Sequence, residues 1–304
     1  CGLFFFLSLG AYIRARRKNS PSAMWLSCSL VAFLIALLFK EMAFTLPVVV
    51  VLLDYLILEE STETFSAKLR RWLPFFGAFA FYSVLRMNAL GVFAHRMVHI
   101  PIGAGDRFLT TIYFVGRYLQ DLIAPFRHNA YHVFRPFSEL AATEWILPIL
   151  LLALGGAVTW KLLNTNRKLC FLALWVAVTI VPVLNLEGVG QNTYAERYLY
   201  IPSLGFCLLL SALIERFGRQ IPYHGGDIAC ALLVLGFSIL TIGRNPAWKD
   251  DVTLSTATIS VSPDAALIHN NLGAVYLGKR DSAAARQEFL AALAADSRTF
   301  VRSL

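Results

Sequence analysis

The sequence predicts an all-α protein in which a polytopic bundle of membrane helices precedes a helical repeat. Hydrophobic residues make up 57% of the 304 residues and charged residues 15%, against about 45–50% and about 25% in soluble domains. The hydrophobic residues gather in long runs that short charged loops separate. After residue 244 the pattern changes to that of a soluble helical hairpin. This composition excludes an ordinary soluble enzyme, a disordered tail and a coiled coil.

The apolar runs predict the membrane helices one by one. The first run is shorter than the roughly 20 residues that a bilayer requires, and it starts at Cys1 without a methionine. Thr299–Leu304 ends without a polar cap, so we expect a chain that lacks residues at both ends. The candidate spans are Gly2–Ile13, Ala23–Phe39, Met42–Leu58, Trp72–Leu90, Trp145–Trp160, Leu169–Leu184, Leu199–Leu213 and Ile228–Ile242.

The positive charge predicts how these helices are oriented. Net charge is +8, and the excess lies in residues 1–244, where 21 Lys and Arg face 13 Asp and Glu. Cytoplasmic loops of membrane proteins are rich in Lys and Arg, so this charge indicates a membrane and no nucleic acid partner. Four loops on one side hold twelve Lys and Arg, whereas the short loops opposite hold two. The four loops are 14–22, 59–71, 161–168 and 215–226.

The segment Phe108–Ala124 is apolar but is interrupted by Arg117 and Asp121. The charge asymmetry between the two sides holds only if this segment does not cross the membrane, so we predict an interfacial or re-entrant helix. Its two charged residues share one helical face at i,i+4 spacing, and we expect that face at the membrane surface or lining a donor cavity. Residues 91–143 then form one long extracytoplasmic segment, and the region after 244 also lies outside.

A repeat motif predicts the structure of residues 245–304. The spacing matches the tetratricopeptide pattern W-x2-L-G-x2-Y…A-x3-F-x2-A, with His269 in place of the Trp and Ser297 in place of the terminal Pro. Asp251–Val261 is predicted as the second helix of a preceding, degenerate repeat, and further repeats are expected after Leu304 because one repeat cannot bury its apolar face alone. A generic Ala-rich hairpin is the alternative. The packing positions are Leu272, Gly273, Tyr276, Ala285, Phe289 and Ala292.

Charged residues beside the membrane are the candidate functional residues, because such charges are costly. Lys40 and Glu41 lie between two apolar runs, where an ion-paired turn is the structural alternative. Arg86 lies near the outer end of a span and either meets a lipid phosphate or extends to the interface. Asp54 is nearer the inner side, and we interpret it as structural.

The segment Ala195–Pro202 is the most informative of these. It places Glu196 and Arg197 at the outer mouth of a span, followed by Tyr198 and Tyr200. The tyrosines are expected either as interfacial anchors or near a ligand. A Glu–Arg pair binds phosphate through the guanidinium fork while the carboxylate fixes its geometry.

These features together resemble the transmembrane and tetratricopeptide-repeat-containing O-mannosyltransferases and their bacterial relatives, within the GT-C class. The resemblance covers nearly the whole chain, and Ala195–Phe206 is its most specific part. It implies inverting transfer of a sugar, typically mannose, from a polyprenyl phosphate carrier to a protein hydroxyl outside the cytoplasm, with the repeat region as a candidate acceptor contact. The matching stretches are Leu38–Thr45, Trp175–Asn185, Ala195–Phe206 and Asn245–Trp248, with Arg107–Thr111 and Ala124–Pro125 in the long outer segment.

The resemblance also implies a division of roles in the reaction. Inverting transfer requires a carboxylate that takes the hydroxyl proton and positive groups at the departing phosphate. The family's acidic catalytic motif lies in the first outer loop, which we expect upstream of Cys1, so the catalytic residue is unknown. Lys40, Arg86 and Arg197 are the phosphate-binding candidates; the orienting candidates are Glu41, Glu196, Tyr198 and Tyr200.

The sequence identifies no cofactor, since it carries no nucleotide-binding, Walker or metal signature, although it leaves a divalent metal open. His95 with His99 and His128 with His132 each show i,i+4 spacing, and we interpret them as loop histidines. The five cysteines form no CxxC pair. Two other functions compete with the transferase. One is a membrane-anchored repeat scaffold, for which eight spans are too many, and the other is a lipid-linked substrate transporter, for which internal duplication is missing.

Overall fold

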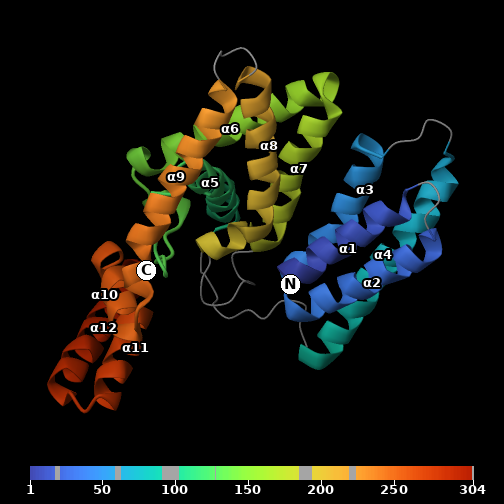
Figure 1. Ribbon diagram of the computed structural model, residues 1–304. Helices are drawn as coiled ribbons and strands as arrows, with labels where there is room; N and C mark the ends of the chain where they lie inside the picture. The colour runs from blue at the N-terminus through green and yellow to red at the C-terminus, as the bar shows by residue number, and fades with distance from the viewer. Residues whose placement is uncertain are drawn as a thin grey trace.

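The computed structural model describes residues 1–17, 21–58, 63–90, 103–126, 128–184, 194–218 and 224–302. Within these ranges the chain forms α-helices and short 3₁₀ turns with no β-strand, which confirms the predicted all-α class (Figure 1). The α-helices are α1 (Gly2–Ala15), α2 (Ser22–Phe39), α3 (Leu46–Leu56), α4 (Phe65–Leu90), α5 (Ala104–Ile123), α6 (Ala142–Thr165), α7 (Arg167–Ile180), α8 (Tyr200–Gly218), α9 (Gly225–Arg244), α10 (Asp251–Val261), α11 (Ala266–Gly278) and α12 (Ser282–Arg302).

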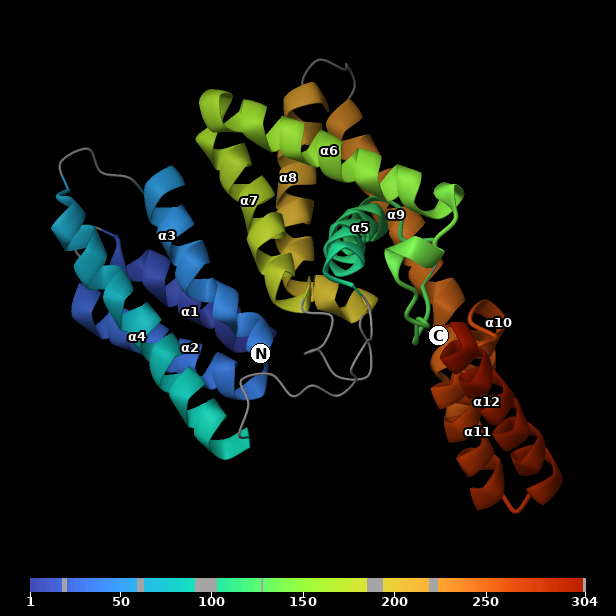
Figure 2. The same ribbon diagram turned by 180° about the vertical axis from the view of Figure 1, so that it is seen from behind.

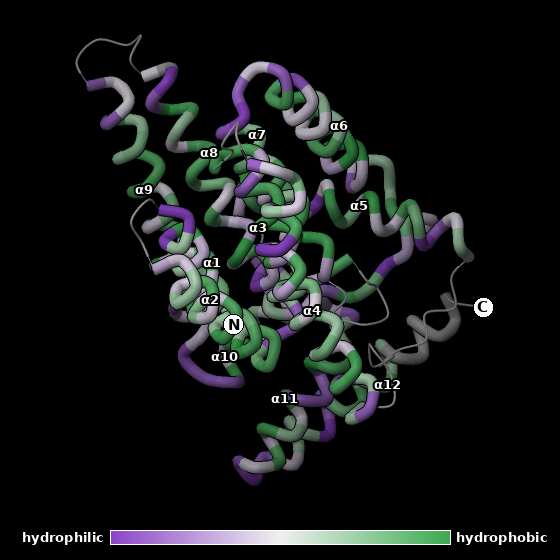
Figure 3. The backbone as a smooth tube through the Cα atoms, turned by 90° about the vertical axis from the view of Figure 1, so that its right-hand side faces the viewer, coloured by the Kyte–Doolittle hydropathy of each residue, from purple (hydrophilic) through white to green (hydrophobic). Residues whose placement is uncertain are grey.

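Five of the described helical segments are long and apolar enough to cross a membrane, which identifies a multi-pass membrane protein. Most of their surface is exposed to the outside of the bundle, as expected of helices that face lipid. Figure 3 shows long hydrophobic stretches along α7 and α8 and a mixed pattern along α11 and α12. The five segments are Ser22–Phe39, Ala142–Thr165, Arg167–Leu184, Glu196–Arg216 and Gly225–Trp248.

Three expected spans are absent from these five described segments. The run Gly2–Ile13 forms α1, which has only 14 residues. The run Met42–Leu58 begins as the 3₁₀ turn η1 (Glu41–Thr45), and its α-helix, α3, has 11 residues. The run Trp72–Leu90 is part of α4, which has 26 residues but carries several basic side chains. The basic residues of α4 are Lys68, Arg70, Arg71 and Arg86.

The helices before residue 245 form two groups that meet beside the N-terminus. Figures 1 and 2 show α1–α4 on one side and α5–α9 on the other, with α10–α12 projecting away from both. Helix α3 and turn η1 pack against α7 and the 3₁₀ turn η3 (Val181–Leu184). Buried aromatic rings continue the core across this junction, where Phe5 meets the edge of Trp175 at 5.8 Å between ring centroids.

Helix α5 lies across the other helices of its group. Figures 1 and 2 show it almost end-on, while α7 and α8 run lengthwise in the same views. Its polar face is turned inward: Arg117 Nε lies 3.9 Å from Asp121 Oδ1, and Asp121 accepts a hydrogen bond from the buried Tyr194 hydroxyl. Arg117 also lines a polar cavity of about 460 Å³ between α5 and α6.

The C-terminal region forms the expected helical hairpin. Helix α10 has the bounds Asp251–Val261, and α11 and α12 pack along each other. Gly273 lies so close to the ring of Phe289 that a Cβ there would stand 2.7 Å from Cε1. His269, at the position of the repeat's Trp, is buried, and its Nδ1 lies 2.7 Å from Glu288. The helices therefore approach closely at the residues that the repeat motif assigns to packing.

Candidate functional site

The turn between α2 and α3 places Lys40 and Glu41 at one end of the bundle. Helix α2 ends at Phe39, and Lys40 takes an extended conformation before η1 begins. Pro47 then lies in the first turn of α3, where the missing N–H costs no helical hydrogen bond. Lys40 and Glu41 therefore lie in the non-α-helical connection between α2 and α3, and both are half-buried.

A second turn brings Glu196–Leu199 (η4) to the same place. It precedes α8, which is held against α7 because Nε1 of Trp175 donates to the carbonyl of Ile201 at 2.9 Å. Gly205 faces the same indole, and a Cβ there would stand 2.3 Å from Trp175 Cδ1. This contact requires glycine, and together with the hydrogen bond it holds the start of α8, which follows η4, close to α7.

These two turns and α4 form a group that we name the Tyr198 cluster: Lys40, Glu41, Arg86, Arg197 and Tyr198. The Lys40 ammonium lies 4.8 Å from the centroid of the Tyr198 ring, and the Arg197 guanidinium lies 5.1 Å from it. Arg197 also donates to the Tyr198 hydroxyl at 3.5 Å. Tyr198 is 3% exposed, so two cations from distant segments share one buried aromatic ring.

Arg86 joins the cluster from the end of α4. Its guanidinium donates to the Glu41 carboxylate, with which it forms an ion pair, and to the Tyr82 hydroxyl at 3.1 Å. The structure thus brings all three predicted phosphate-binding residues to one end of the bundle, with Glu41 orienting Arg86. Arg197 is exposed, whereas Arg86 is half-buried.

Electrostatic repulsion is present within the cluster. Burial lowers the pKa of Lys40, the positive charge of Arg197 lowers it further, and Glu41 partly opposes both effects. Two like charges at a partly desolvated site raise the free energy of the protein unless an anion compensates them. A phosphate or carboxylate is the kind of group that would compensate these charges.

Two predicted orienting residues have other contacts. Glu196, expected to orient Arg197, accepts hydrogen bonds from the backbone N–H of Asn129 at 3.0 Å and from Nε2 of His132 at 2.8 Å. Tyr200 is exposed and lies beside Phe6, at 6.4 Å between ring centroids, away from the Tyr198 ring. Sequence reasoning missed Asn129, which carries no local motif. His132 lies in a non-helical segment, as interpreted from the sequence, but its bond to Glu196 depends on a contact between distant segments.

A cavity of about 420 Å³ adjoins the cluster at Arg197. It lies between η4, the residues after α5 and the end of α9. Its lining includes Asn129, Glu196, Arg197, Thr241, Arg244 and Trp248.

No group of three or more His, Cys, Asp or Glu side chains with the geometry of a metal site occurs within the described ranges. His132 bonds Glu196 instead of a second histidine. His95 and His99 lie outside the described residues, so the structure does not test the interpretation of that pair.

Comparison with known proteins gives partial matches. No family model and no solved structure matches the chain. Protein O-mannosyl-transferase F38B6.6 of Caenorhabditis elegans is 31% identical over 115 residues, which are 38% of this chain and 16% of that protein. Protein O-mannosyl-transferase tmtc2 of Xenopus laevis is 36% identical over 118 residues, 37% of this chain and 14% of the relative. Protein O-mannosyl-transferase TMTC3 of Homo sapiens is 29% identical over 143 residues, 46% of this chain and 16% of the relative.

The chain thus spans no more than 16% of the length of these relatives. All three carry the name of the family that the motifs Leu38–Thr45 and Ala195–Phe206 resemble, so the similarity to this family is confirmed.

Proposed function

Taking this similarity as the premise, we propose that the chain is the membrane part of a glycosyltransferase that moves mannose from a polyprenyl phosphate to a protein hydroxyl. The observation that carries the proposal is the Tyr198 cluster, in which Lys40 and Arg197 share one tyrosine ring. A carrier phosphate placed between these cations relieves their repulsion and gains charge-assisted hydrogen bonds from the guanidinium.

The cluster acts in this proposal on the leaving group of the reaction. The acceptor oxygen attacks the anomeric carbon while the bond from that carbon to the phosphate oxygen breaks. The electron pair of the broken bond stays on the phosphate, and the hydroxyl proton passes to a carboxylate base. Because the phosphate gains charge in the transition state, Lys40 and Arg197 stabilise the transition state more than the bound donor.

Substitution of Arg197 tests this role directly. We expect Arg197→Ala in the full-length protein to lower turnover by about 10²–10³, as for removal of one preorganised donor. Arg197→Lys should recover only part of the turnover, because an ammonium lacks the planar fork. The unfolding temperature should stay unchanged, since Arg197 is exposed.

Arg216, in the last turn of α8 and also exposed, is the matched control. Arg216→Ala should leave both turnover and stability at the wild-type level. Near-normal turnover per folded Arg197→Ala molecule, or an equal loss in both variants, would refute the proposed role.

The orientation in the membrane is also part of the proposal. We place the Tyr198 cluster and α10–α12 on the extracytoplasmic side, with the hairpin positioned to contact the acceptor protein, because the loops of the opposite side hold most of the basic residues. In a variant without its native cysteines, an impermeant thiol reagent should label a cysteine at Ala283 and spare one at Asn164. Labelling at Asn164 with Ala283 protected would show that the orientation is the reverse of the one proposed. A third expected label position, Gln191, lies outside the described residues.

A further inference from the structure

Two of the residues that line the cavity beside Arg197 carry buried polar atoms without a partner in the described part of the chain. Its volume of about 420 Å³ falls within the roughly 300–1,000 Å³ typical of small-molecule sites. Two buried polar atoms on its lining residues, Asn129 Oδ1 and Arg244 Nη2, have no hydrogen-bond partner within the described part of the chain. Buried polar atoms are almost always hydrogen-bonded, so these two indicate the chemistry of a ligand.

The orientation of the Asn129 amide is determined by its neighbours. Its Nδ2 donates to the carbonyl of Tyr131 at 2.8 Å and to the hydroxyl of Ser262 at 2.8 Å. A carbonyl oxygen only accepts hydrogen bonds, so the amide nitrogen must face Tyr131 and the amide oxygen must face the other way. Asn129 is 5% exposed. Its Oδ1 is therefore a fixed acceptor that requires an O–H or N–H donor.

Arg244 presents the complementary requirement. It is the last residue of α9, and its Nη2 is a buried donor that requires an oxygen acceptor. Arg197 lines the same cavity and also contacts Tyr198, so the cavity and the Tyr198 cluster share one guanidinium. Phe237 and Trp248 add an apolar wall. A single ligand that satisfies these groups carries hydroxyl donors and acceptor oxygens next to a phosphate.

We propose that this cavity binds the sugar of the glycosyl phosphate, with Asn129 Oδ1 accepting from a sugar hydroxyl and Arg244 Nη2 donating to a sugar oxygen. The inference rests on the proposed function, in which Arg197 holds the phosphate of the same carrier. It goes beyond that function because it assigns the recognition of the sugar to Asn129 and Arg244, two residues that make no contact with the Tyr198 ring in the described contacts.

Filling the cavity separates sugar binding from phosphate binding. Thr241 lines the cavity, whereas Ile239 lies on the same helix, is 61% exposed and is not part of the lining. The chain in lipid nanodiscs is titrated with polyprenyl-phosphate mannose and, separately, with polyprenyl phosphate that carries no sugar. Thr241→Trp should weaken binding of the mannosylated carrier by about tenfold or more, or about 1.4 kcal/mol, and change binding of the bare carrier less than about twofold. Ile239→Trp should change neither.

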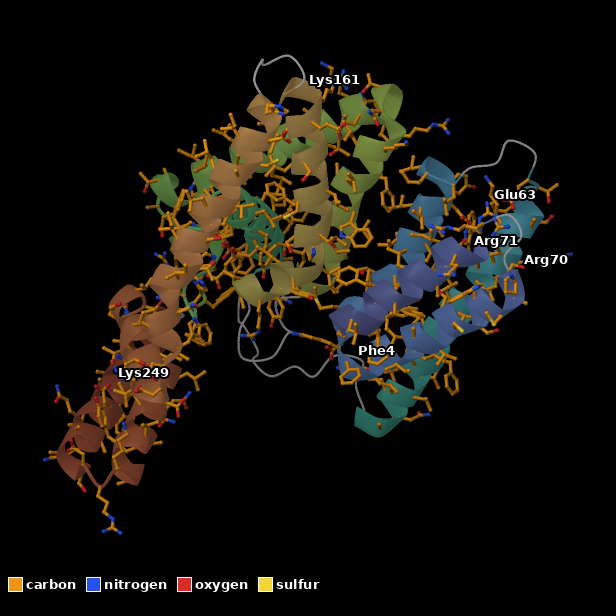
Figure 4. The ribbon with its side chains drawn as sticks, viewed as in Figure 1. Phe4, Glu63, Arg70, Arg71, Lys161 and Lys249 are labelled. Atoms are coloured by element: carbon orange, nitrogen blue, oxygen red, sulfur yellow. The ribbon has the colours of Figure 1, made fainter. Side chains whose placement is uncertain are left out.

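Substitution of Arg244 provides an independent test that keeps the cavity open. Arg244→Gln should weaken the mannosylated carrier selectively, because a neutral amide replaces a charged donor. The control is Lys249→Gln. Lys249 lies past the end of α9, beside α10 (Figure 4), and does not line the cavity. Wild-type unfolding temperatures for both variants would show that the fold is kept.

The outcomes distinguish this inference from the proposed function. If the wild-type chain binds neither carrier, the proposed function fails and the sugar assignment fails with it. If the wild-type chain binds both carriers but Thr241→Trp and Arg244→Gln bind the mannosylated carrier normally, only the sugar assignment is overturned. Equal weakening of both carriers would identify the cavity as a phosphate or lipid site and would also overturn it.

Discussion

The two ends of the α1–α4 bundle hold charged residues in opposite ways. At one end is a group that we name the Asp54 cluster: Tyr12, Arg16, Asp54, Glu63, Arg71 and Trp72. Asp54 is 1% exposed, and one of its oxygens accepts from the Tyr12 hydroxyl at 2.6 Å and from Trp72 Nε1 at 2.9 Å. Figure 4 shows Glu63 and Arg71 together at this end and Phe4 at the other. Phe4 stacks on Phe39, the residue before Lys40.

The acids of the Asp54 cluster are bound by its arginines. Glu63 accepts from Arg71 at 2.8 and 2.9 Å and from Arg16 at 2.8 and 3.1 Å, so two guanidinium groups hold one carboxylate. Both arginines also lie 3.3 Å from Asp54. The four charges sum to zero, and they join α1, α3 and α4.

At the Tyr198 end the acids have different partners. Glu41 pairs with Arg86 and Glu196 bonds His132, while Lys40 and Arg197 lie over the same tyrosine ring. The comparison teaches that a charge near a membrane does not by itself indicate a binding site, although its cost suggests a function. A balanced, mutually bonded group of charges connects helices, whereas we propose that the cations that converge on the Tyr198 ring bind an anionic ligand.

Removal of the Asp54 carboxylate should have the largest effect on the stability of the protein. We expect Asp54→Ala to lower the free energy of unfolding by about 3–5 kcal/mol, because it leaves buried arginines without their carboxylate. Thermal unfolding in detergent, followed by the loss of the native peak on size-exclusion chromatography, measures the effect. A change within about 0.5 kcal/mol, as at ordinary surface positions, would show that the Asp54 cluster does not hold the helices together.

Two neighbouring arginines on α4 sharpen the comparison. Arg71 bonds Glu63 and Asp54, whereas Arg70 is exposed and points away from the bundle (Figure 4). Arg71→Ala should lower the free energy of unfolding by roughly 1.5–3 kcal/mol, the range for hydrogen bonds to charged groups. Arg70→Ala should change it by less than about 0.5 kcal/mol. If both variants lost the same free energy of unfolding, the loss would come from the changed net charge of α4 and not from the Asp54 cluster.

The aromatic face at the other end should affect ligand binding. If Tyr198 positions Lys40 and Arg197 for a phosphate, Tyr198→Leu should weaken donor binding roughly two- to thirtyfold, since cation–π contacts contribute about 0.5–2 kcal/mol. Tyr198→Phe keeps the ring and should stay within about twofold of the wild type. Donor titration in nanodiscs distinguishes the two. If Tyr198→Leu lowered stability but left donor binding unchanged, the Tyr198 cluster would have a structural role, like the Asp54 cluster.

Acid should weaken the ion pairs of the Asp54 cluster, an effect that is absent at neutral pH. The hydrogen bonds from Arg71 and the charge of Arg16 lower the pKa of Glu63 from its usual value near 4.5 to about 2. A carboxylate with a lowered pKa stabilises the fold above its unfolded pKa and loses this contribution as pH falls through its folded pKa. The unfolding temperature should therefore decline between about pH 4.5 and pH 2. Glu63→Gln should flatten this decline, and an unchanged decline in that variant would assign the effect to another group.

Local patterns in the sequence predicted the elements of the fold. Apolar runs predicted α2, α6, α7, α8 and α9, because a helix that faces lipid needs an unbroken hydrophobic surface. The tetratricopeptide pattern predicted the close approach of α11 and α12, because it places the small Gly273 opposite the ring of Phe289 on the next helix. The interpretation of Asp54 as structural also agrees with its contacts.

The partners of the charged side chains were decided only by the tertiary structure. The adjacent Glu196 and Arg197 predict a local pair, yet Glu196 bonds Asn129, 67 residues away, and Glu41 pairs with Arg86, 45 residues away. Neighbouring residues in a turn point in different directions, and each side chain bonds whatever the packed helices bring within about 3 Å. The sequence by itself determined where helices form and which charges lie near the membrane. The packing of α1–α4 against α7 and α8 decided which of these charges neutralise each other and which meet at Tyr198.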